Sequence, residues 1–401
     1  MALASNMSTR HFVIVGAGLA GAKTAEHLRA LGYDGRISLI GNEHVRPYER
    51  PPLTKDYLLG KAEAEKAFVH PQSWYADNDV DLLLDATVES LGGNTVALSN
   101  GTELTFDRLA ITTGARPRRL DLPGSDMPGI HYLRTMDDAQ RVRDLFTMDN
   151  LAIVGAGWIG LEVAAAARAS GVQVTVLETA ELPLLRVLGP RIATVFADLH
   201  RDHGVHMEFG ISIDGFEVEG VRLADGRLIP AQAVVVGVGV VPNTELAEGA
   251  GLAVDNGILA DEHLRTSHPD IFAAGDVVNA THPVLGRRIR VEHWANALNQ
   301  PAVVAAGMLD QDATYDRLPY FFTDQYDLGM EYVGHADATS EVIVRGDESA
   351  REFVAFWLSE GRVQAGMNVN VWDVPIRELI LSQRVVDPTR LADPDIPLAE
   401  V

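Results

Sequence analysis

The chain has 401 residues, more than a single hydrophobic core usually supports, so two or three domains are expected. Hydrophobic residues make up 47% of the chain and charged residues 22%, a balance typical of globular proteins. The net charge of −23 argues against general nucleic-acid binding, which needs a concentrated basic surface. Cysteine is absent, which excludes disulfides, thiolate metal sites and redox-active thiol pairs, and we expect no metal site.

The hydropathy pattern predicts no membrane contact. The longest apolar runs, at residues 153–167 and 231–241, are short or interrupted by glycine and a charge, so none reaches membrane-spanning length. Residues 1–10 contain no long apolar segment of the kind found in signal peptides. We therefore expect a cytoplasmic protein.

A βαβ unit is predicted at the start of the chain. A strand-like run at residues 11–15 leads into G-A-G-L-A-G, which contains Gly16, Gly18 and Gly21, and a helical stretch then extends to about residue 31. A second apolar run follows at residues 37–40. This order predicts two parallel strands joined by a crossover helix, with the glycine turn at the carboxyl end of the first strand.

The same order of elements occurs a second time. An apolar run at residues 151–154 precedes G-A-G-W-I-G, which contains Gly155, Gly157 and Gly160, and an alanine-rich helix and the strand-like run 172–177 follow. The chain therefore contains an internal repeat of a dinucleotide-binding unit. In such units the first glycine makes the tight turn, the second admits the pyrophosphate, and the third lets helix and strand pack closely.

An acidic residue follows each glycine motif at roughly the 20-residue distance that the dinucleotide fingerprint requires. These residues are Glu43, beside which Asn42 is an alternative ribose ligand, and Glu178. A carboxylate accepts hydrogen bonds from ribose hydroxyls and repels a 2′-phosphate. Because no arginine follows Glu178 closely, the second site is expected to prefer NADH to NADPH.

The remaining segments predict an α/β protein with a different C-terminal part. Residues 81–98 are strand-like with a turn at 92–94, and the apolar run 109–112 leads into T-T-G-A-R-P, near which we place a boundary. From about Leu318 the composition changes to short aromatic and β-branched strands. The predicted fold is thus two Rossmann-like dinucleotide-binding domains and a C-terminal α+β domain.

The segment R-P-Y-E-R-P-P-L-T-K at residues 46–55 resembles the FAD-dependent, NADH-dependent ferredoxin and rubredoxin reductases of dioxygenase and haem-monooxygenase systems, which are related to apoptosis-inducing factor. The resemblance covers nearly the whole chain and includes V-G-V-G-V-V-P-N (236–243), I-F-A-A-G-D (271–276) and R-V-E-H-W (290–294). It implies an FAD-binding domain in two parts (1–116 and 244–317), an NADH-binding domain between them (117–243) and a C-terminal interface domain (318–401).

The resemblance also implies roles for individual residues. Arg50 and Lys55 would contact the flavin, Val88 the adenine side of FAD, and Asp276 the ribityl chain. Further cofactor-binding residues implied by the motifs are Thr113, Gly114, Arg134, Gly239, Glu292 and His293. Outside the family's motifs, simpler roles remain open, such as solvated loop cations for Arg50 and Lys55, an interior histidine for His293 and a helix N-cap for Asp276.

One position departs from the family pattern. Many relatives carry a tryptophan near Pro319, where this chain has Y-F-F-T-D (320–324), and Phe322 is the expected replacement. The aromatic ring is kept but the indole N–H donor is lost, which puts any role of that tryptophan in doubt here.

The family pairing of Lys55 with Glu162 predicts an ion pair next to the flavin, and these two residues are the candidate catalytic groups. Glu162 lies two residues past Gly160 in the first turn of the second helix, where the alternative role is a carboxylate that interacts with the helix dipole. Two arginine clusters, Arg116, Arg118 and Arg119 together with Arg287, Arg288 and Arg290, are candidates for docking an acidic electron carrier, or a solvated rim.

These features predict an enzyme that passes hydride from NADH to FAD and single electrons to an iron–sulfur ferredoxin or rubredoxin that serves an oxygenase. Disulfide reductases and NADH peroxidases are excluded because they need a cysteine. An NADH:quinone oxidoreductase, or a protein whose assembly responds to NADH as in apoptosis-inducing factor, remains an alternative. The sequence leaves open whether the protein is a monomer or a homodimer.

Overall fold

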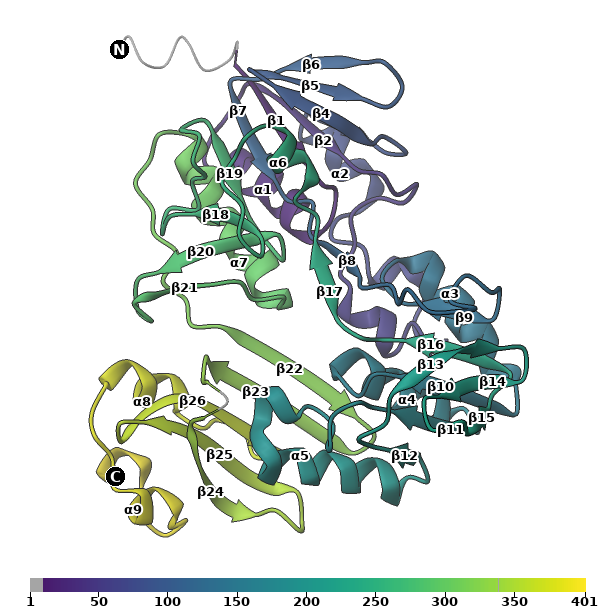
Figure 1. The fold of residues 1–401 in the computed structure, drawn as a ribbon. Coiled ribbons are helices and arrows are strands. Elements are labelled where there is room, and N and C mark those ends of the chain that lie inside the picture. The colour runs from purple at the N-terminus through teal and green to yellow at the C-terminus, as the bar shows by residue number, and fades with distance from the viewer. Residues whose placement is uncertain (1–9, 338) are drawn as a thin grey trace. The chain divides into compact units, whose positions relative to one another are not determined.

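The computed structural model describes residues 10–337 and 339–401, whose helices and strands are labelled in Figure 1. The chain divides into two compact units, each made of three segments. Unit 1 contains the residues up to Glu49, Ala64–Arg116 and Val241–Pro319. Unit 2 contains Arg50–Glu63, Pro117–Val240 and Tyr320–Val401.

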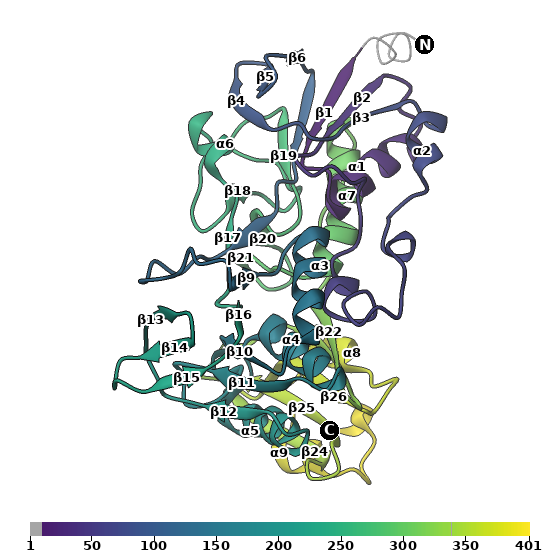
Figure 2. The same ribbon diagram turned by 90° about the vertical axis from the view of Figure 1, so that its right-hand side faces the viewer.

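Unit 1 is built on a five-stranded parallel sheet with the order β19-β7-β1-β2-β3. Its central strands are almost entirely apolar and buried, as is typical of parallel strands covered on both faces. Figure 2 shows β1 and β2 side by side, and α1 packs against α7. The elements are β1 (His11–Val15), α1 (Leu19–Ala30), β2 (Arg36–Ile40), β3 (Val80–Leu83), β7 (Arg108–Ile111), β19 (Ile271–Ala273) and α7 (Trp294–Met308).

Two small three-stranded sheets complete unit 1. The first, β4-β5-β6, is antiparallel, and the predicted turn at residues 92–94 joins β4 to β5. The second, β18-β20-β21, is mixed. The elements of this part are α2 (Gln72–Asp77), β4 (Val88–Gly92), β5 (Thr95–Leu98), β6 (Glu103–Thr105), α6 (Glu245–Gly249), β18 (Ile258–Ala260), β20 (Val278–His282) and β21 (Arg287–Ile289).

Unit 2 repeats the architecture of unit 1 and confirms the predicted second βαβ unit. Its five-stranded parallel sheet has the order β12-β11-β10-β16-β9, and β10 pairs in parallel with both β11 and β16. A small antiparallel sheet, β13-β14-β15, follows along the chain. The elements are β9 (Ile130–Tyr132), α3 (Met136–Asp144), β10 (Asn150–Val154), α4 (Trp158–Ala169), β11 (Gln173–Leu177), β12 (His206–Glu208), β13 (Ile213–Glu217), β14 (Gly220–Leu223), β15 (Leu228–Pro230) and β16 (Ala233–Val236).

The C-terminal part of unit 2 is α+β, as predicted. It is an antiparallel sheet with the order β22-β23-β26-β25-β24, and strand β25 is buried along most of its length around Trp357. The elements are β22 (Tyr320–Gln325), β23 (Leu328–Gly334), β24 (Glu341–Asp347), β25 (Glu352–Ser359), β26 (Arg362–Val369), α8 (Ile376–Ser382) and α9 (Pro388–Ala392).

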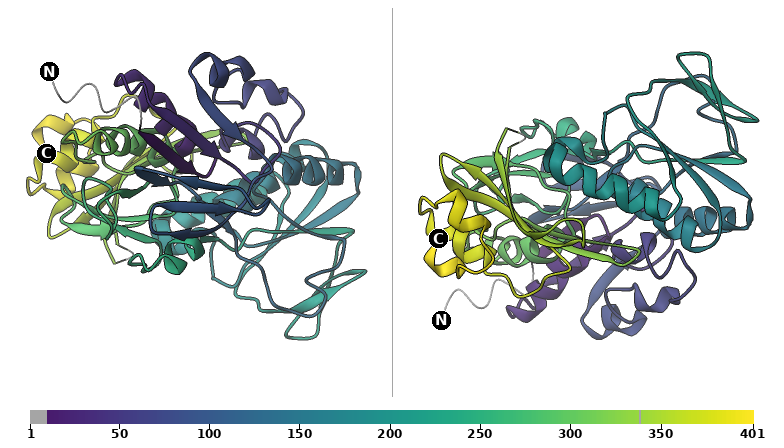
Figure 3. Two further views of the ribbon diagram at one scale, coloured as in Figure 1. Left: turned by 90° about the horizontal axis from the view of Figure 1, so that it is seen from above. Right: turned by 90° about the horizontal axis from the view of Figure 1, so that it is seen from below.

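Helix α5 (Leu185–Asp202) was not expected from the sequence. It runs beside the C-terminal strands of unit 2 (Figure 3). Its Arg191 pairs with Glu348 at 2.6 Å. Gly189 has a left-handed φ of 75° and interrupts the helix just before Pro190. The residue before a proline avoids helical backbone, so this dipeptide marks a break between two helical pieces.

The apolar run 234–241 forms two strands instead of one. Strand β16 ends at Val236, and β17 (Val240–Pro242) begins after Gly239, whose φ is +92°. Strands β8 (Ala115–Pro117) and β17 stand at two of the points where the chain passes from one unit to the other. The overall class is the predicted one, α/β with parallel, Rossmann-like sheets.

Candidate functional site

The first glycine turn, in unit 1, has the geometry that a dinucleotide phosphate needs. Gly16 has φ +114°, and a Cβ there would lie 2.3 Å from the carbonyl oxygen of Thr112. A Cβ on Gly21 would lie 2.0 Å from the oxygen of Gly16, so only glycine lets helix and turn approach this closely. Gly18, by contrast, faces open space and is the N-cap of α1 without any side-chain cap. The N–H groups of this helix start are therefore available to an anion.

The second turn, in unit 2, reproduces this geometry position by position. Gly155 has φ +101° and sits against the carbonyl of Gly237, where a Cβ would approach to 2.4 Å. A Cβ on Gly160 would lie 2.1 Å from the oxygen of Gly155. Gly157 faces open space and begins α4 with no side-chain cap. Both turns thus fit a bound pyrophosphate.

The two acidic residues after the turns differ in their surroundings. Glu178 directly follows β11, and its Oε2 accepts a hydrogen bond from the N–H of Ala156 at 2.7 Å, while Oε1 accepts one from Ala180 at 2.9 Å. The carboxylate is thereby tied to the glycine turn itself. Glu43 lies three residues past β2 and accepts a hydrogen bond from the Tyr48 hydroxyl at 2.5 Å.

The predicted ion pair between Lys55 and Glu162 is present, with Lys55 Nζ donating to Glu162 Oε1 at 2.7 Å. Glu162 is only 7% exposed, yet its carboxylate is fully satisfied. The hydroxyl of Thr323 donates to the same oxygen at 2.5 Å, and the hydroxyl of Thr54 donates to Oε2. Three elements therefore meet at this carboxylate: the short helix before Lys55, α4 and β22. Glu162 is the fifth residue of α4 and lies just past its first turn, so the predicted place in the first turn was wrong.

Sequence reasoning identified Lys55 and Glu162 but missed Thr54 and Thr323. The available signal for Thr323 was the two-residue alternation of β22, in which Thr323 and Gln325 point to the buried side. Phe322 lies on the other face of this strand, with its ring centroid 5.4 Å from Lys55 Nζ. The ammonium of Lys55 therefore lies near a carboxylate and an aromatic ring.

The equivalent position in the first repeat is occupied by a residue of opposite charge. Lys23 lies two residues past Gly21, as Glu162 does past Gly160, and it pairs with Glu26 at 2.7 Å on the same helix. The buried acceptor is therefore a property of the second repeat alone.

The other cofactor-binding candidates of unit 1 lie in loops and at strand ends. Thr113 donates to the carbonyl of Asn243 at 2.8 Å, and Gly114 takes a left-handed φ of 65°. Glu292 is paired with Arg290. The rest are Val88 at the start of β4, Asp276 directly after the A-A-G turn that follows β19, and His293, the N-cap of α7.

In unit 2, Arg50 donates to the main-chain carbonyl of Arg134, so these two candidates lie together. Gly239 accepts a hydrogen bond from the N–H of Arg118 at 2.9 Å through its carbonyl oxygen. Of the docking candidates, Arg119 lies over the ring of Tyr132.

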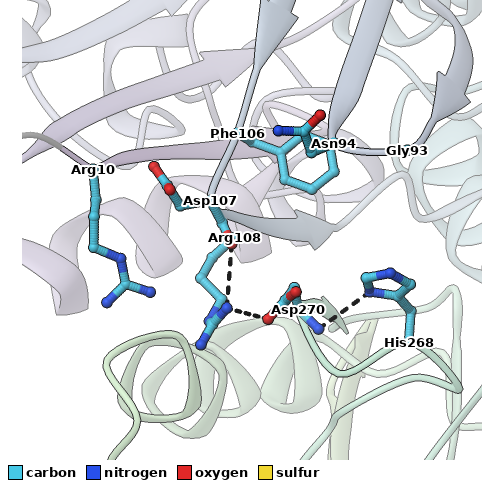
Figure 4. A pocket seen from close by; sticks show the side chains of 8 residues that line it. All are labelled: Arg10, Gly93, Asn94, Phe106, Asp107, Arg108, His268 and Asp270. Atoms are coloured by element: carbon cyan, nitrogen blue, oxygen red, sulfur yellow. Dashed lines mark hydrogen bonds and ion pairs between the residues drawn. The ribbon is translucent and has the colours of Figure 1, made fainter.

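A separate cavity of about 410 Å³ opens at the opposite edge of the unit 1 sheet (Figure 4). Arg10, Asp107 and Asp270 line it at the amino ends of β1, β7 and β19, whereas the glycine turn lies at the carboxyl ends. Arg108 also lines the cavity and forms an ion pair with Asp270. Ligands of open α/β sheets bind outside the carboxyl ends of the strands, so this cavity is not the dinucleotide site.

Residues 10–337 and 339–401 contain neither a membrane-spanning helix nor a group of metal-ligating side chains. Among these residues no helix is both long and apolar enough to cross a membrane. In the same part of the chain, no three histidine or acidic side chains are grouped as a metal ion would require.

Comparisons with known proteins agree with this geometry. The profile of the pyridine nucleotide-disulphide oxidoreductase family matches residues 10–300, and that of the reductase C-terminal domain matches residues 320–401. The chain is 39% identical to putidaredoxin reductase of Pseudomonas putida, over 97% of this chain and 96% of that protein. It is 41% identical to the ferredoxin–NAD(+) reductase component of the anthranilate 1,2-dioxygenase system of Burkholderia cepacia, over 98% and 99%.

Among solved structures, the reductase in the covalent putidaredoxin reductase–putidaredoxin complex superimposes with a TM-score of 0.94 at 38% identity, covering 98% of both chains. The ferredoxin reductase of the CYP199A2 system from Rhodopseudomonas palustris gives a TM-score of 0.93 at 35% identity, covering 98% of this chain and all of that one. With both glycine turns formed and both family profiles matched, the chain belongs to the pyridine nucleotide-disulphide oxidoreductase family and carries its reductase C-terminal domain.

Proposed function

We propose that the chain is an NADH-dependent, FAD-containing ferredoxin reductase whose acceptor is an iron–sulfur ferredoxin or rubredoxin that feeds an oxygenase. The observation that carries this proposal is the pair of glycine turns, each of which leaves an uncapped helix start for a pyrophosphate. Relatives named as ferredoxin–NAD(+) reductase components and as rhodocoxin reductase support the assignment. Because the chain has no cysteine, the final acceptor must be a separate molecule.

The two cofactors supply the redox chemistry, since bound FAD takes up an electron pair from NADH and releases electrons singly. The protein's own residues bind the two cofactors, orient them and provide charged groups beside them. The first turn holds the FAD pyrophosphate and the second that of NADH, with Glu178 on the ribose of NADH and Glu43 on that of FAD. Glu162 holds the Lys55 ammonium in one position, and in our proposal this positive charge lies beside the flavin.

The domain boundaries follow the same proposal. Residues 1–116 and 244–317 form the FAD-binding domain, residues 117–243 the NADH-binding domain, and residues 318–401 the interface domain. Arg50, Arg134, Asp276, Glu292, His293 and Phe322 are proposed to surround the flavin, and Thr113, Gly114, Val88 and Gly239 to contact the cofactors. We also propose that the protein is cytoplasmic and is a monomer or a homodimer.

The test uses the purified holoenzyme. Replacing Lys55 by methionine removes the charge and keeps most of the side-chain volume, so the FAD content should stay unchanged. Flavin reduction by NADH, followed by its absorbance in a stopped-flow instrument, should slow by roughly a hundredfold, the cost of removing one preorganised electrostatic group. Lys23→Met is the control because it also removes a lysine charge that is paired with a glutamate, here Glu26 on the same helix, but at the first repeat's counterpart of Glu162.

Equal reduction rates in Lys55→Met and the wild type would remove Lys55 from the mechanism. The acceptor is tested separately, by offering the reduced enzyme iron–sulfur proteins from the same genome. If none of them is reduced, the reductase assignment itself is wrong.

A further inference from the structure

A chain of buried polar side chains leads away from Glu162 inside unit 2. Thr323, which donates to Glu162, accepts a hydrogen bond from Gln325 Nε2 at 3.2 Å. Gln325 Oε1 in turn lies 2.8 Å from His200 Nε2. Thr323 and Gln325 are each 1% exposed and His200 is fully buried. This series of hydrogen-bonded side chains joins α4, β22 and α5.

The outer end of this chain is Tyr326, whose hydroxyl lies 3.3 Å from His200 Nδ1. Tyr326 occupies the two-residue turn between β22 and β23 with a left-handed φ of 56°, which is uncommon for an aromatic residue. Its ring stacks on His203 with a centroid distance of 3.7 Å. The β22–β23 turn, at the outer end of this series of hydrogen bonds, therefore contacts the C-terminal end of α5.

The carboxylate of Glu162 fixes the direction of every hydrogen bond along this chain. A carboxylate only accepts, so Thr323 must use its single proton to donate to Glu162 and must accept from the amide of Gln325. The amide then presents its oxygen to His200, which must carry its proton on Nε2. Nδ1 is left as the acceptor for the Tyr326 hydroxyl. One tautomer of His200 and one orientation of Gln325 satisfy all of these groups.

The environment of His200 agrees with this assignment. Burial lowers the pKa of His200 to about 4, although the hydrogen bond to Gln325 partly opposes this shift. The neighbouring titratable groups are His203, the C-cap residue of α5, which also lowers this pKa, and Tyr326 in the turn. His200 is therefore neutral at neutral pH, as a ring with one donor and one acceptor nitrogen requires.

Such a chain does not conduct protons well, because a side-chain amide would have to pass through its imidic acid form. Burying three polar side chains has a cost that well-packed apolar residues would avoid. Fully satisfied polar networks instead fix a single arrangement of their members. A positioning role explains why these polar side chains are buried and why all of their hydrogen-bonding groups are satisfied.

We propose that Thr323, Gln325 and His200 are positioning residues that fix the Glu162 carboxylate, and through it the Lys55 ammonium, for flavin reduction by NADH. This inference rests on the proposed function of the Lys55–Glu162 pair. Within residues 10–337 and 339–401, no hydrogen bond or ion pair joins any of the three to Lys55, so their influence is expected to pass through Glu162.

The first test examines the hydrogen bonds of His200 in the absence of NADH, so that no flavin reduction takes place. In holoenzyme carrying ¹⁵N-labelled histidine, NMR nitrogen shifts, with His200→Gln for assignment, should show His200 as the neutral Nε2–H tautomer between pH 8 and pH 6. In Thr323→Val these shifts should move, although Thr323 does not touch His200. The Nδ1–H tautomer, a tautomer mixture, or His200 shifts that ignore Thr323→Val would overturn the proposal.

The second test measures the limiting rate of flavin reduction and the dissociation constant of NADH. Thr323→Val removes one charge-assisted hydrogen bond to Glu162 and should slow reduction roughly tenfold. The dissociation constant of NADH should stay within about twofold of the wild-type value because Thr323 is not part of the glycine turn that binds the coenzyme. Substitutions at sites that do not contact each other have nearly independent effects. Thr323→Ser, which restores the hydroxyl, should recover most of the rate.

The matched control is Thr24→Val, since Thr24 is another fully buried threonine, and its hydroxyl bonds only the carbonyl of Ala20 at 2.8 Å among the contacts described. A wild-type rate in Thr323→Val, or an equal loss in Thr24→Val, would contradict the positioning role. Flavin reduction is observed without an iron–sulfur acceptor. Failure of the acceptor assignment and failure of the positioning role therefore give different results.

Discussion

The carboxylate of Glu178 serves two purposes that substitutions can separate. One is the proposed contact with the ribose of NADH, and the other is the support it gives the glycine turn through Ala156. Glu178→Arg should raise kcat/KM for NADPH relative to NADH by roughly a hundredfold, because a 2′-phosphate then meets a cation instead of an anion.

Glu178→Gln is the control for this experiment because it removes the charge while keeping an oxygen that can accept from Ala156. It should relax the preference for NADH without loss of folded protein. A wild-type preference for NADPH, or an unchanged ratio in Glu178→Arg, would refute the assignment of Glu178.

His200 makes stability depend on pH in a predictable direction. Its pKa is lowered to about 4 in the folded chain, so the unfolded chain binds the proton more readily. Stability from this residue is complete above the ordinary histidine pKa and is lost as the pH falls from about 6.5 towards 4. At pH 5 the loss amounts to about 2 kcal/mol.

Thermal unfolding midpoints at pH 8 and pH 5 check this expectation. The decrease between the two pH values should be smaller in His200→Gln than in the wild type. His206→Gln, at a histidine whose side chain is 66% exposed, serves as the control. An equal decrease in the wild type and His200→Gln would show that His200 takes up its proton as readily in the folded chain as in the unfolded one.

Single residues were predictable where the chemistry restricts the choice of side chain. Lys55 and Glu162 lie within recognisable motifs, and the structure confirms their ion pair. The alternation of β22 marks Thr323 and Gln325 as buried, but no sequence signal indicates that they pair with Glu162 and His200. Their partnership depends on α5 meeting β22, which are more than a hundred residues apart along the chain.

At the scale of elements, the glycine turns allow a test that separates folding from binding. Gly157 has extended backbone that alanine can adopt, and a Cβ there meets no protein atom within 4 Å. Gly157→Ala should therefore fold and retain FAD. The added methyl group should nevertheless weaken NADH binding, raising KM by roughly tenfold or more, because the pyrophosphate must approach this backbone closely.

Gly249→Ala is the matched control because Gly249 also faces open space and lies at the end of the short helix α6. NADH affinity and FAD content should both be unchanged in that variant. Tight NADH binding by Gly157→Ala would show that the coenzyme does not use this turn.

The sequence predicted these turns well because steric limits leave little freedom at them. Gly16 and Gly155 have positive φ angles, and the third glycines pack against the turn backbone, so the spacing is set by geometry. Helix α5 was missed because Gly189-Pro190 resembles a boundary between elements, and the structure does break the helix there, with a second helical piece after Pro190. Side-chain contacts with the C-terminal part of unit 2, among them Arg191–Glu348 and His200–Gln325, add to its stability.

At the scale of the whole molecule, the net charge of −23 opposes attraction of an acidic partner, so docking requires local basic surface. The structure shows that several candidate arginines already have partners. Arg116 pairs with Glu245 and Arg290 with Glu292, while Arg288 donates to the carbonyls of Ala260 and Asn279. Charge reversal at Arg288 would thus disturb the local fold.

Arg287→Glu tests docking at the second arginine cluster. It should slow reduction of a small acidic iron–sulfur protein by about threefold to tenfold at low salt, and added salt should slow the wild type more than the variant. Reduction of ferricyanide, which needs no docking surface, should not change. Arg186→Glu, at an exposed arginine on α5, makes the same change in net charge and is the control. An unaltered rate in Arg287→Glu would place docking elsewhere.

The duplicated βαβ unit gives the molecule an internal standard of comparison. Features found in both copies, the three glycines and the uncapped helix start, are what any bound dinucleotide demands of its host. The position two residues past the third glycine differs, with Lys23 in one copy and Glu162 in the other. In the proposed function, the shared features serve ligand binding in both copies, and this one position separates a helix start that holds its ligand from one that also holds a charged group for the reaction.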